Sequence, residues 1–147
     1  MATRRIDPNH RKKVISMMDE AVDPTKTDAT AYATTLDLKH VGFIEGMHPT
    51  FFLLAPISPL QELEINEAHQ KIIPPSLDKD NKPVRAQIKF ERQGEMSLKY
   101  FKHCVKGLEE DGKEVPFKEE EFSLGIMQEI GSYAMLYSRV GEKLKKT

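Results

Sequence analysis

The sequence predicts a mostly α-helical protein with a small β-hairpin, which is an α+β fold. Apolar residues recur at helical spacing over much of the second half of the chain, and a serine–proline pair marks one helix start. A single stretch near residues 36–56 alternates between apolar and polar side chains, as a half-buried strand does. A chain of 147 residues is long enough to form one domain with an ordinary hydrophobic core.

The first 28 residues are expected to form an N-terminal arm that carries a helix. Asp7 can cap this helix, Pro8 suits its first position, and apolar residues at 14, 17, 18 and 21 recur at spacings of three and four. The polar run 23–28 contains a proline and is typical of a turn. The sequence therefore predicts a helix over 7–22, followed by a single domain over 29–147.

The segment 29–57 is expected to be extended. Apolar and polar residues alternate from Leu36 to Phe43, the run 46–49 favours a turn, and 50–54 is rich in β-branched and aromatic residues. Two strands joined at 45–49 would form a β-hairpin near 36–56. Because an isolated hairpin is only marginally stable in water, this one should pack on helices or pair with another chain.

Two helices are expected after the hairpin. Ser58 can cap a helix that begins at Pro59 and runs to about Lys71, with Leu60 and Leu63 facing inward. A polar loop over 76–83 follows, and residues 84–110 form the second helical segment, in which Gly94 allows a break near 93–95. The pair at 111–112, Asp-Gly, is expected to close that helix with a turn.

A last helix is expected from about residue 119 to the C-terminal lysines. Three consecutive glutamates at 119–121 would lie in its first turn, where negative charge complements the helix dipole. The residues expected to form its inward stripe are Phe122, Ile126, Ile130, Tyr133, Ala134, Tyr137, Val140 and Leu144.

Charge and hydropathy favour neither a nucleic-acid partner nor a membrane. The chain has 22 Lys plus Arg against 23 Asp plus Glu, whereas a nucleic-acid-binding domain usually has a basic excess. No apolar run approaches the ~20 residues that a membrane-spanning helix needs. The run 1–7 has no apolar stretch, so we expect no secretory signal and a protein that stays in the compartment where it is made.

The sequence predicts no catalytic, metal or cofactor site. Five histidines and one cysteine are scattered without zinc-site spacing, and no glycine-rich phosphate loop or G-x-S-x-G motif occurs. Cys104 falls on the apolar stripe of its expected helix, which is typical of a small core residue. A non-enzymatic protein is therefore expected. An enzyme whose site is assembled by folding from scattered His, Glu and Cys remains a more distant alternative.

The hairpin and the last helix carry the apolar side chains that are candidates for binding a partner. Adjacent phenylalanines on a strand point to opposite faces of the sheet, so they cannot both be buried in the same core. One of them must be covered by another part of the chain or by a partner. These side chains either complete the core or receive an apolar helix or strand from another protein. The candidate partner-binding residues are Phe51, Phe52, Phe122, Ile126, Tyr133 and Tyr137.

Two segments resemble the tail assembly chaperones of tailed bacteriophages. The first, FFLLAPISPLQE at 51–62, is an apolar strand that leads through a proline–serine–proline start into an acidic helix. The second, FKHCVKGLEEDGKEVPF at 101–117, is similar to their pattern of a helix followed by D-G-x-x-V-P-F before a terminal helix. The sequence departs from the pattern at Leu108, where a tryptophan is common, and lacks paired prolines near 124–127.

The resemblance implies a mostly helical, non-enzymatic protein of the host cell cytoplasm. It would keep the phage tape-measure protein soluble during tail assembly, using apolar grooves and a charged exterior. The alternative is a structural component of the virion, such as a head–tail connector, neck or tail subunit. The hairpin at 36–56 and the N-terminal arm at 1–28 would then bind its neighbours by strand addition and arm exchange. The expected partners are the tape-measure protein or other tail and virion subunits, and a homo-oligomer is compatible with either reading.

Overall fold

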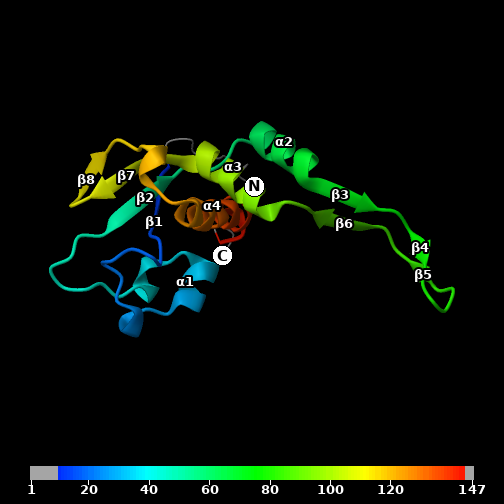
Figure 1. Ribbon diagram of the computed structural model, residues 1–147, viewed down its shortest axis with the longest axis horizontal. Helices are drawn as coiled ribbons and strands as arrows, with labels where there is room; N and C mark the ends of the chain where they lie inside the picture. The colour runs from blue at the N-terminus through cyan, green and yellow to red at the C-terminus, as the bar shows by residue number, and fades with distance from the viewer. Residues whose placement is uncertain (1–9, 145–147) are drawn as a thin grey trace, which may run out of the picture.

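The computed structural model describes residues 10–144, with side chains as far as Ser138, and shows a mixed α and β fold (Figure 1). The mostly helical prediction is therefore wrong. The α-helices within this range are α1 (Ala29–Thr35), α2 (Pro59–His69), α3 (Gln93–Cys104) and α4 (Leu124–Leu144), and the 3-10 helices are η1 (Pro24–Lys26), η2 (Leu38–His40) and η3 (Glu119–Glu121). The strands are β1 (Lys12–Val14), β2 (Thr50–Leu54), β3 (Gln70–Ile73), β4 (Ser76–Leu77), β5 (Pro83–Val84), β6 (Gln87–Phe90), β7 (Val105–Glu110) and β8 (Lys113–Val115).

Four of these strands form an antiparallel sheet in the order β1-β2-β7-β8. A two-residue turn joins β7 to β8, and both of its residues, Asp111 (φ 52°) and Gly112 (φ 74°), have positive φ. This is the backbone that a tight type I′ hairpin loop requires, and Asp-Gly is a preferred sequence for it. The predicted helix over 84–110 is therefore wrong at both ends: residues 87–90 form the strand β6, α3 begins only at Gln93, and residues 105–110 form β7.

The predicted N-terminal helix over 7–22 does not form in its described part, and residues 7–9 lie outside the described range. Residues 12–14 instead pair with β2, with Lys13 opposite Leu53. Val14 and Ile15 are fully buried, and the Ile15 amide donates a hydrogen bond to the Tyr32 hydroxyl (2.7 Å). Pairing with a strand far along the chain has overridden the helical spacing of this segment.

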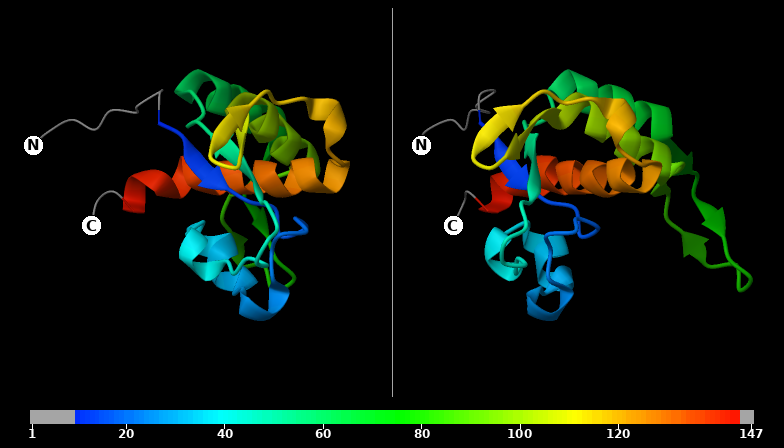
Figure 2. Two further views of the ribbon diagram at one scale, coloured as in Figure 1. Left: turned by 90° about the vertical axis from the view of Figure 1, so that its left-hand side faces the viewer. Right: turned by 60° about the vertical axis from the view of Figure 1, so that its left-hand side comes forward.

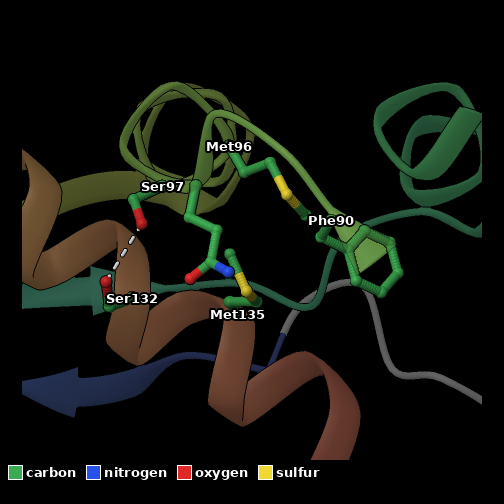
Figure 3. Close-up of a pocket in the computed structure, with 6 residues that line it drawn as sticks. Phe90, Met96, Ser97, Ser132 and Met135 are labelled. Carbon is green, nitrogen blue, oxygen red and sulfur yellow. Dashed lines mark hydrogen bonds between the residues drawn. The ribbon is translucent and has the colours of Figure 1, made fainter. Parts of the chain in front are cut away.

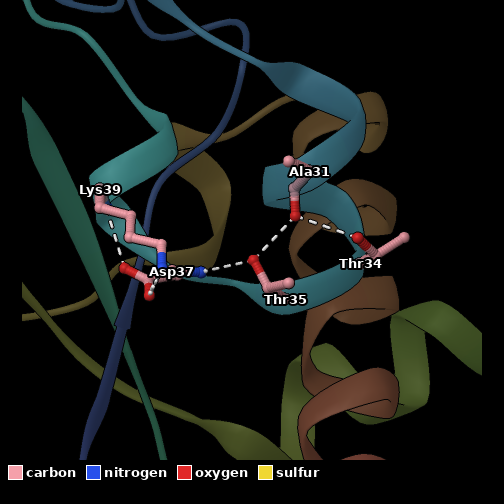
Figure 4. Close-up of polar contacts among 5 residues, drawn as sticks. All are labelled: Ala31, Thr34, Thr35, Asp37 and Lys39. Carbon is pink, nitrogen blue, oxygen red and sulfur yellow. Dashed lines mark hydrogen bonds and ion pairs between the residues drawn. The ribbon is translucent and has the colours of Figure 1, made fainter.

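The predicted hairpin near 36–56 is also wrong, although its second strand, β2, is present. Leu36 is the left-handed C-cap of α1 (φ 56°), and Phe43 makes only an isolated bridge to Val22. Figure 4 shows the polar contacts after α1, where Thr35 Oγ1 donates to the Ala31 carbonyl (2.8 Å) and Asp37 accepts from the Lys39 amide (3.0 Å). These local side-chain contacts favour turns over a strand.

The core lies between the four-stranded sheet and the helices α3 and α4, which cross in close contact (Figure 2). A cluster of aromatic rings joins them: Phe52 packs against Phe101 (centroids 6.2 Å apart) and Phe122 (5.1 Å). Gly131 of α4 lies directly against the Ser97 carbonyl oxygen, so that an added Cβ would clash with it. No helix within the described residues is both long and apolar enough to cross a membrane.

The last helix begins later than predicted. The glutamates at 119–121 form the separate 3-10 helix η3, and α4 starts at Leu124, where Ser123 Oγ accepts from the Ile126 amide (3.3 Å). The inward stripe is confirmed for Ile130, Tyr133 and Ala134, all of which are buried. The side chains of Val140 and Leu144 lie outside the described residues.

Candidate protein-binding surface

The residues 70–90 form a long two-stranded ribbon that projects from the body of the protein (Figures 1 and 2). We call it the arm. Its proximal half pairs β3 with β6, and its distal half pairs β4 with β5. The sequence predicts a loop over 76–83 and a helix from 84, so the arm is a feature that sequence reasoning missed.

Hydrogen bonds fix the base of the arm to the end of α2. The Glu91 amide donates to the His69 carbonyl (2.8 Å), and His69 Nδ1 lies 3.0 Å from the Glu91 carbonyl oxygen. Arg92 Nη2 donates to the Ala68 carbonyl (3.0 Å), and the Lys71 ammonium lies 3.4 Å from the Glu91 carboxylate. His69 is 1% exposed and anchors the clamp in the packed interior, whereas Ala68, Lys71, Glu91 and Arg92 are exposed.

The arm presents apolar side chains to solvent. Ile72 and Ile88 lie directly opposite each other across the two strands and are 65% and 62% exposed. Farther out, Leu77 is 65% exposed. Opposed residues of an antiparallel pair point to the same face of the ribbon, so the two isoleucines form one apolar patch that no other part of the described chain covers.

The arm is also basic. Between residues 70 and 90 the chain carries five lysines and arginines against two aspartates, a net charge of +3. The basic residues, all exposed, are Lys71, Lys79, Lys82, Arg85 and Lys89. Because the whole chain has a net charge of −1, the positive charge of the arm is balanced by acidic residues elsewhere.

The outward side of α2 has the opposite character. Leu60 and Leu63 are 75% and 52% exposed, and the exposed Glu64 and Glu67 lie on the same face at helical spacing. We call these four residues the α2 outer face. The predicted helix start is confirmed, because Ser58 Oγ accepts from the Gln61 amide (3.2 Å). The prediction that Leu60 and Leu63 face inward is wrong.

Ile65 and His69 of α2 face inward in place of those leucines. On the same helix the Glu62 carboxylate accepts a long hydrogen bond from the Tyr100 hydroxyl of α3 (3.4 Å). The side of α2 that packs is therefore chosen by its contact with α3. Its two leucines remain available to another molecule.

The six residues predicted to bind a partner lie in or against the core. Phe52 is 2% exposed within the aromatic cluster, and the half-buried Phe122 stacks on Phe117 (5.9 Å between centroids). Phe51 lies on the other face of the sheet, half-buried beneath the Lys13 ammonium (5.7 Å from the ring centroid). Ile126 is half-buried against the core. Partner binding by these residues remains a prediction.

The two tyrosines of the predicted surface are held by internal contacts. Tyr133 is 8% exposed, its ring packs edge-on against Tyr32 (5.4 Å), and its hydroxyl donates to Glu129 (2.7 Å). Burial and the neighbouring Glu129 carboxylate raise the pKa of Tyr133, and burial raises the pKa of Tyr32 to about 12. Tyr137 is half-buried, with its ring 6.1 Å from that of His10.

A cavity of about 180 Å³ lies between α3 and α4 at the root of the arm (Figure 3). The residues that line it are Phe90, Gln93, Met96, Ser97, Ser132 and Met135. Ser97 and Ser132 hydrogen-bond to each other across it (3.0 Å). Pockets for small molecules usually occupy roughly 300–1,000 Å³ and carry convergent polar groups, so this cavity is better explained as imperfect packing beside the arm.

Within residues 10–138 the side chains that could carry chemistry are mostly scattered, although His103 and Lys106 both line a cavity of about 450 Å³ beside the start of α2. Cys104 is fully buried, and burial raises its pKa to about 11, which keeps it in the unreactive thiol form. No group of three or more His, Cys, Asp or Glu among residues 10–138 is arranged to hold a metal ion. The surface with the clearest binding character is therefore the arm together with the α2 outer face. The sequence matches no protein-family model and no curated protein, and no solved structure matches it either.

Proposed function

We propose that this chain is a non-enzymatic protein whose arm binds another polypeptide. The observation that carries the proposal is the exposed pair of Ile72 and Ile88 on a ribbon that packs against the core at its root, through Phe90, and projects away from it beyond that point. Large aliphatic side chains held in water on a well-anchored element are typical of a surface that becomes buried on association.

The backbone of the arm supports the same proposal. Its proximal part contains only two strands, β3 and β6, so each of them has an unpaired edge within the described chain. An unpaired strand edge offers amide and carbonyl groups to a further strand, which is a common mode of peptide recognition. The arm thus supplies apolar, charged and backbone contacts at once.

The proposed biological role is that of a bacteriophage tail assembly chaperone, acting on the tape-measure protein in the host cytoplasm. The support for this role is the resemblance of 51–62 and 101–117 to that family. These two segments correspond to β2 with the start of α2, and to the end of α3 with β7 and β8. Elements that flank the arm on both sides therefore carry the resemblance.

Co-expression tests this role. The chain should raise the soluble fraction of its tape-measure protein, and the double substitution Ile72→Asp with Ile88→Asp should abolish that effect, because two carboxylates would replace the apolar patch. Leu124→Asp is the matched control, since Leu124 is 55% exposed on α4, away from the arm. If the tape-measure protein is equally insoluble with and without the chain, the chaperone role is wrong.

A structural subunit of the virion is a second candidate, and the projecting arm specifically favours it, because arms of this kind reach neighbouring subunits in assemblies. Mass spectrometry of purified particles separates the two roles. A structural subunit should be present in fixed stoichiometry, whereas a chaperone should be absent from the mature particle.

A further inference from the structure

We propose that the arm binds a second copy of this chain, with the apolar patch of one arm lying on the α2 outer face of the other copy. This inference rests on the proposed function, because it concerns the same arm: the second copy covers the apolar patch until the other polypeptide displaces it. It is drawn from the complementary chemistry of the two surfaces.

Charge is the first argument. The arm has a net charge of +3, and α2 has a charge of −3 from Glu62, Glu64 and Glu67. Glu64 and Glu67 are exposed and make no salt bridge with another described residue, and neither do Lys79, Lys82 and Arg85, which lie beyond the β3–β6 ladder toward the tip of the arm. Lys71 and Lys89 are paired on the face of the ladder opposite to Ile72 and Ile88, so they do not contribute to this contact. Potentials of opposite sign steer association and disfavour the pairing of arm with arm.

Shape and hydrophobicity match as well. The eleven residues of α2 span about 16 Å at ~1.5 Å per residue. The four-residue ladder of β3 and β6 spans about 13 Å at ~3.3 Å per residue. The two surfaces are therefore similar in length, and Ile72 and Ile88 of one copy can contact Leu60 and Leu63 of the other. The contact would bury all four of these exposed apolar side chains.

The order of the elements makes the contact reciprocal. Since the arm follows α2 without an intervening residue, each copy carries both surfaces side by side. When the arm of one copy lies on α2 of the other, a two-fold axis brings the second arm onto the first α2.

The mass of the purified full-length chain in solution tests the proposal directly. Light scattering should give about twice the mass of one chain, 16.8 kDa. Reversing charge on the α2 outer face, with Glu64→Lys and Glu67→Lys, should weaken dimerisation at least about tenfold, because it sets like charges against the arm. The double reversal Glu120→Lys and Glu121→Lys makes the same change in net charge on exposed residues elsewhere and should leave the dimer intact.

An engineered cross-link tests the geometry. One preparation carries Leu63→Cys on α2 and a second carries Ile88→Cys on the arm. Mixing them under mild oxidation should give a disulfide between the two differently substituted chains, while the buried native Cys104 stays unreacted. Mixing Ile88→Cys with Leu124→Cys is the control, since Leu124 has similar exposure but lies outside the proposed interface, and it should give little cross-linked product.

Two outcomes would overturn the inference: a monomer at every accessible concentration, or cross-linking of Leu63→Cys that is no greater than that of Leu124→Cys. Failure here can be told apart from failure of the proposed function. If the chain is monomeric while Ile72→Asp with Ile88→Asp still abolishes solubilisation of the tape-measure protein, the arm binds a different polypeptide and only the second-copy proposal falls.

Discussion

Glu129 is the residue that joins the N-terminal segment to the last helix. Its carboxylate accepts hydrogen bonds from Ser16 Oγ (2.5 Å), the Met17 amide (2.8 Å) and the Tyr133 hydroxyl (2.7 Å). Hydrogen bonds to a charged acceptor in a partly buried place are stronger than neutral ones. One side chain thus fixes the strand β1 and its continuation against α4.

Glu129→Gln should therefore destabilise the protein with little change of shape. The glutamine side chain keeps one oxygen acceptor, but its NH₂ group would replace the other oxygen and face groups that are themselves hydrogen-bond donors. We therefore expect the free energy of unfolding to fall by about 2–3 kcal/mol. Urea denaturation followed by circular dichroism measures this loss. A change below about 0.5 kcal/mol would show that the three contacts do not hold the segment.

Cys104 should behave as a core residue and not as a reactive thiol. It is fully buried, and a pKa of about 11 in place of 9.0 leaves roughly a hundredth of the usual thiolate fraction at pH 8. Labelling by a disulfide-exchange reagent should therefore be at least about 100-fold slower in the native protein than in denaturant. Rapid labelling of the native protein would contradict the buried position.

At the scale of elements, the contact between α3 and α4 depends on a glycine. Gly131 lies against the Ser97 backbone, so Gly131→Ala would push the two helices apart. Gly125 lies on the same helix, and a Cβ added there would make only an ordinary contact, 3.7 Å from the Met18 methyl group. Alanine at either position would change the helix propensity of α4, but only at position 131 would it disturb the packing of α4 on α3. Comparing the two variants therefore isolates the contribution of packing.

Gly131→Ala should lower the free energy of unfolding by about 3 kcal/mol or more, because neither backbone can yield without loss of core contacts. Gly125→Ala should raise it by up to about 1 kcal/mol, because alanine favours the helix and nothing obstructs it. Thermal or urea denaturation of both variants measures the difference. Equal effects at the two sites would mean that α3 and α4 are not in close contact.

The arm is anchored at its base and exposed along the rest of its length. Its base is fixed by His69, Glu91 and Arg92, whereas the apolar patch farther out, Ile72 and Ile88, is mostly exposed to solvent. A ribbon that is firmly held at its root loses less conformational freedom when it binds, since its geometry is already set. This arrangement suits an element that contacts another polypeptide.

At the scale of the whole molecule, stability should depend on pH in the alkaline range. In the native protein the pKa of Cys104 is about 11 and the pKa of Tyr32 is about 12. In the unfolded chain these two pKa values are near 9.0 and 10.0. The unfolded state therefore binds fewer protons above pH 9, and raising the pH favours unfolding.

The free energy of unfolding should be insensitive to these two groups below about pH 9 and should fall between about pH 9 and 12. Each group contributes up to about 1.4 kcal/mol per pH unit while only its unfolded form is ionised. Denaturation at a series of pH values measures the fall, and Cys104→Ala should reduce it between pH 9 and 11. An unchanged stability up to pH 11 would contradict the buried environment of both side chains.

Features that depend on neighbours along the chain could be predicted from the amino-acid sequence. Ser58 and Pro59 mark the start of α2, and the spacing of Ile130, Tyr133 and Ala134 marks the buried side of α4. Capping and helical spacing involve residues within one or two turns, so their signal is local. The Asp111–Gly112 pair carried a further local signal, for a hairpin, although the apolar spacing before it favoured a helix.

The pairing of strands and the exposure of particular apolar residues depend on contacts between distant parts of the chain, so the sequence did not predict them. The partners of β2 are β1 and β7, each more than thirty-five residues away, and no local pattern identifies them. Leu60 and Leu63 face outward because Ile65 and His69, on the other side of α2, are the residues that pack against the rest of the fold. Ile88 faces solvent because it lies in a strand opposite Ile72 and not in the helix that the sequence predicted. Hydrophobicity shows that a side chain favours burial, but the surface that covers it is set by parts of the chain distant in sequence, or by another molecule.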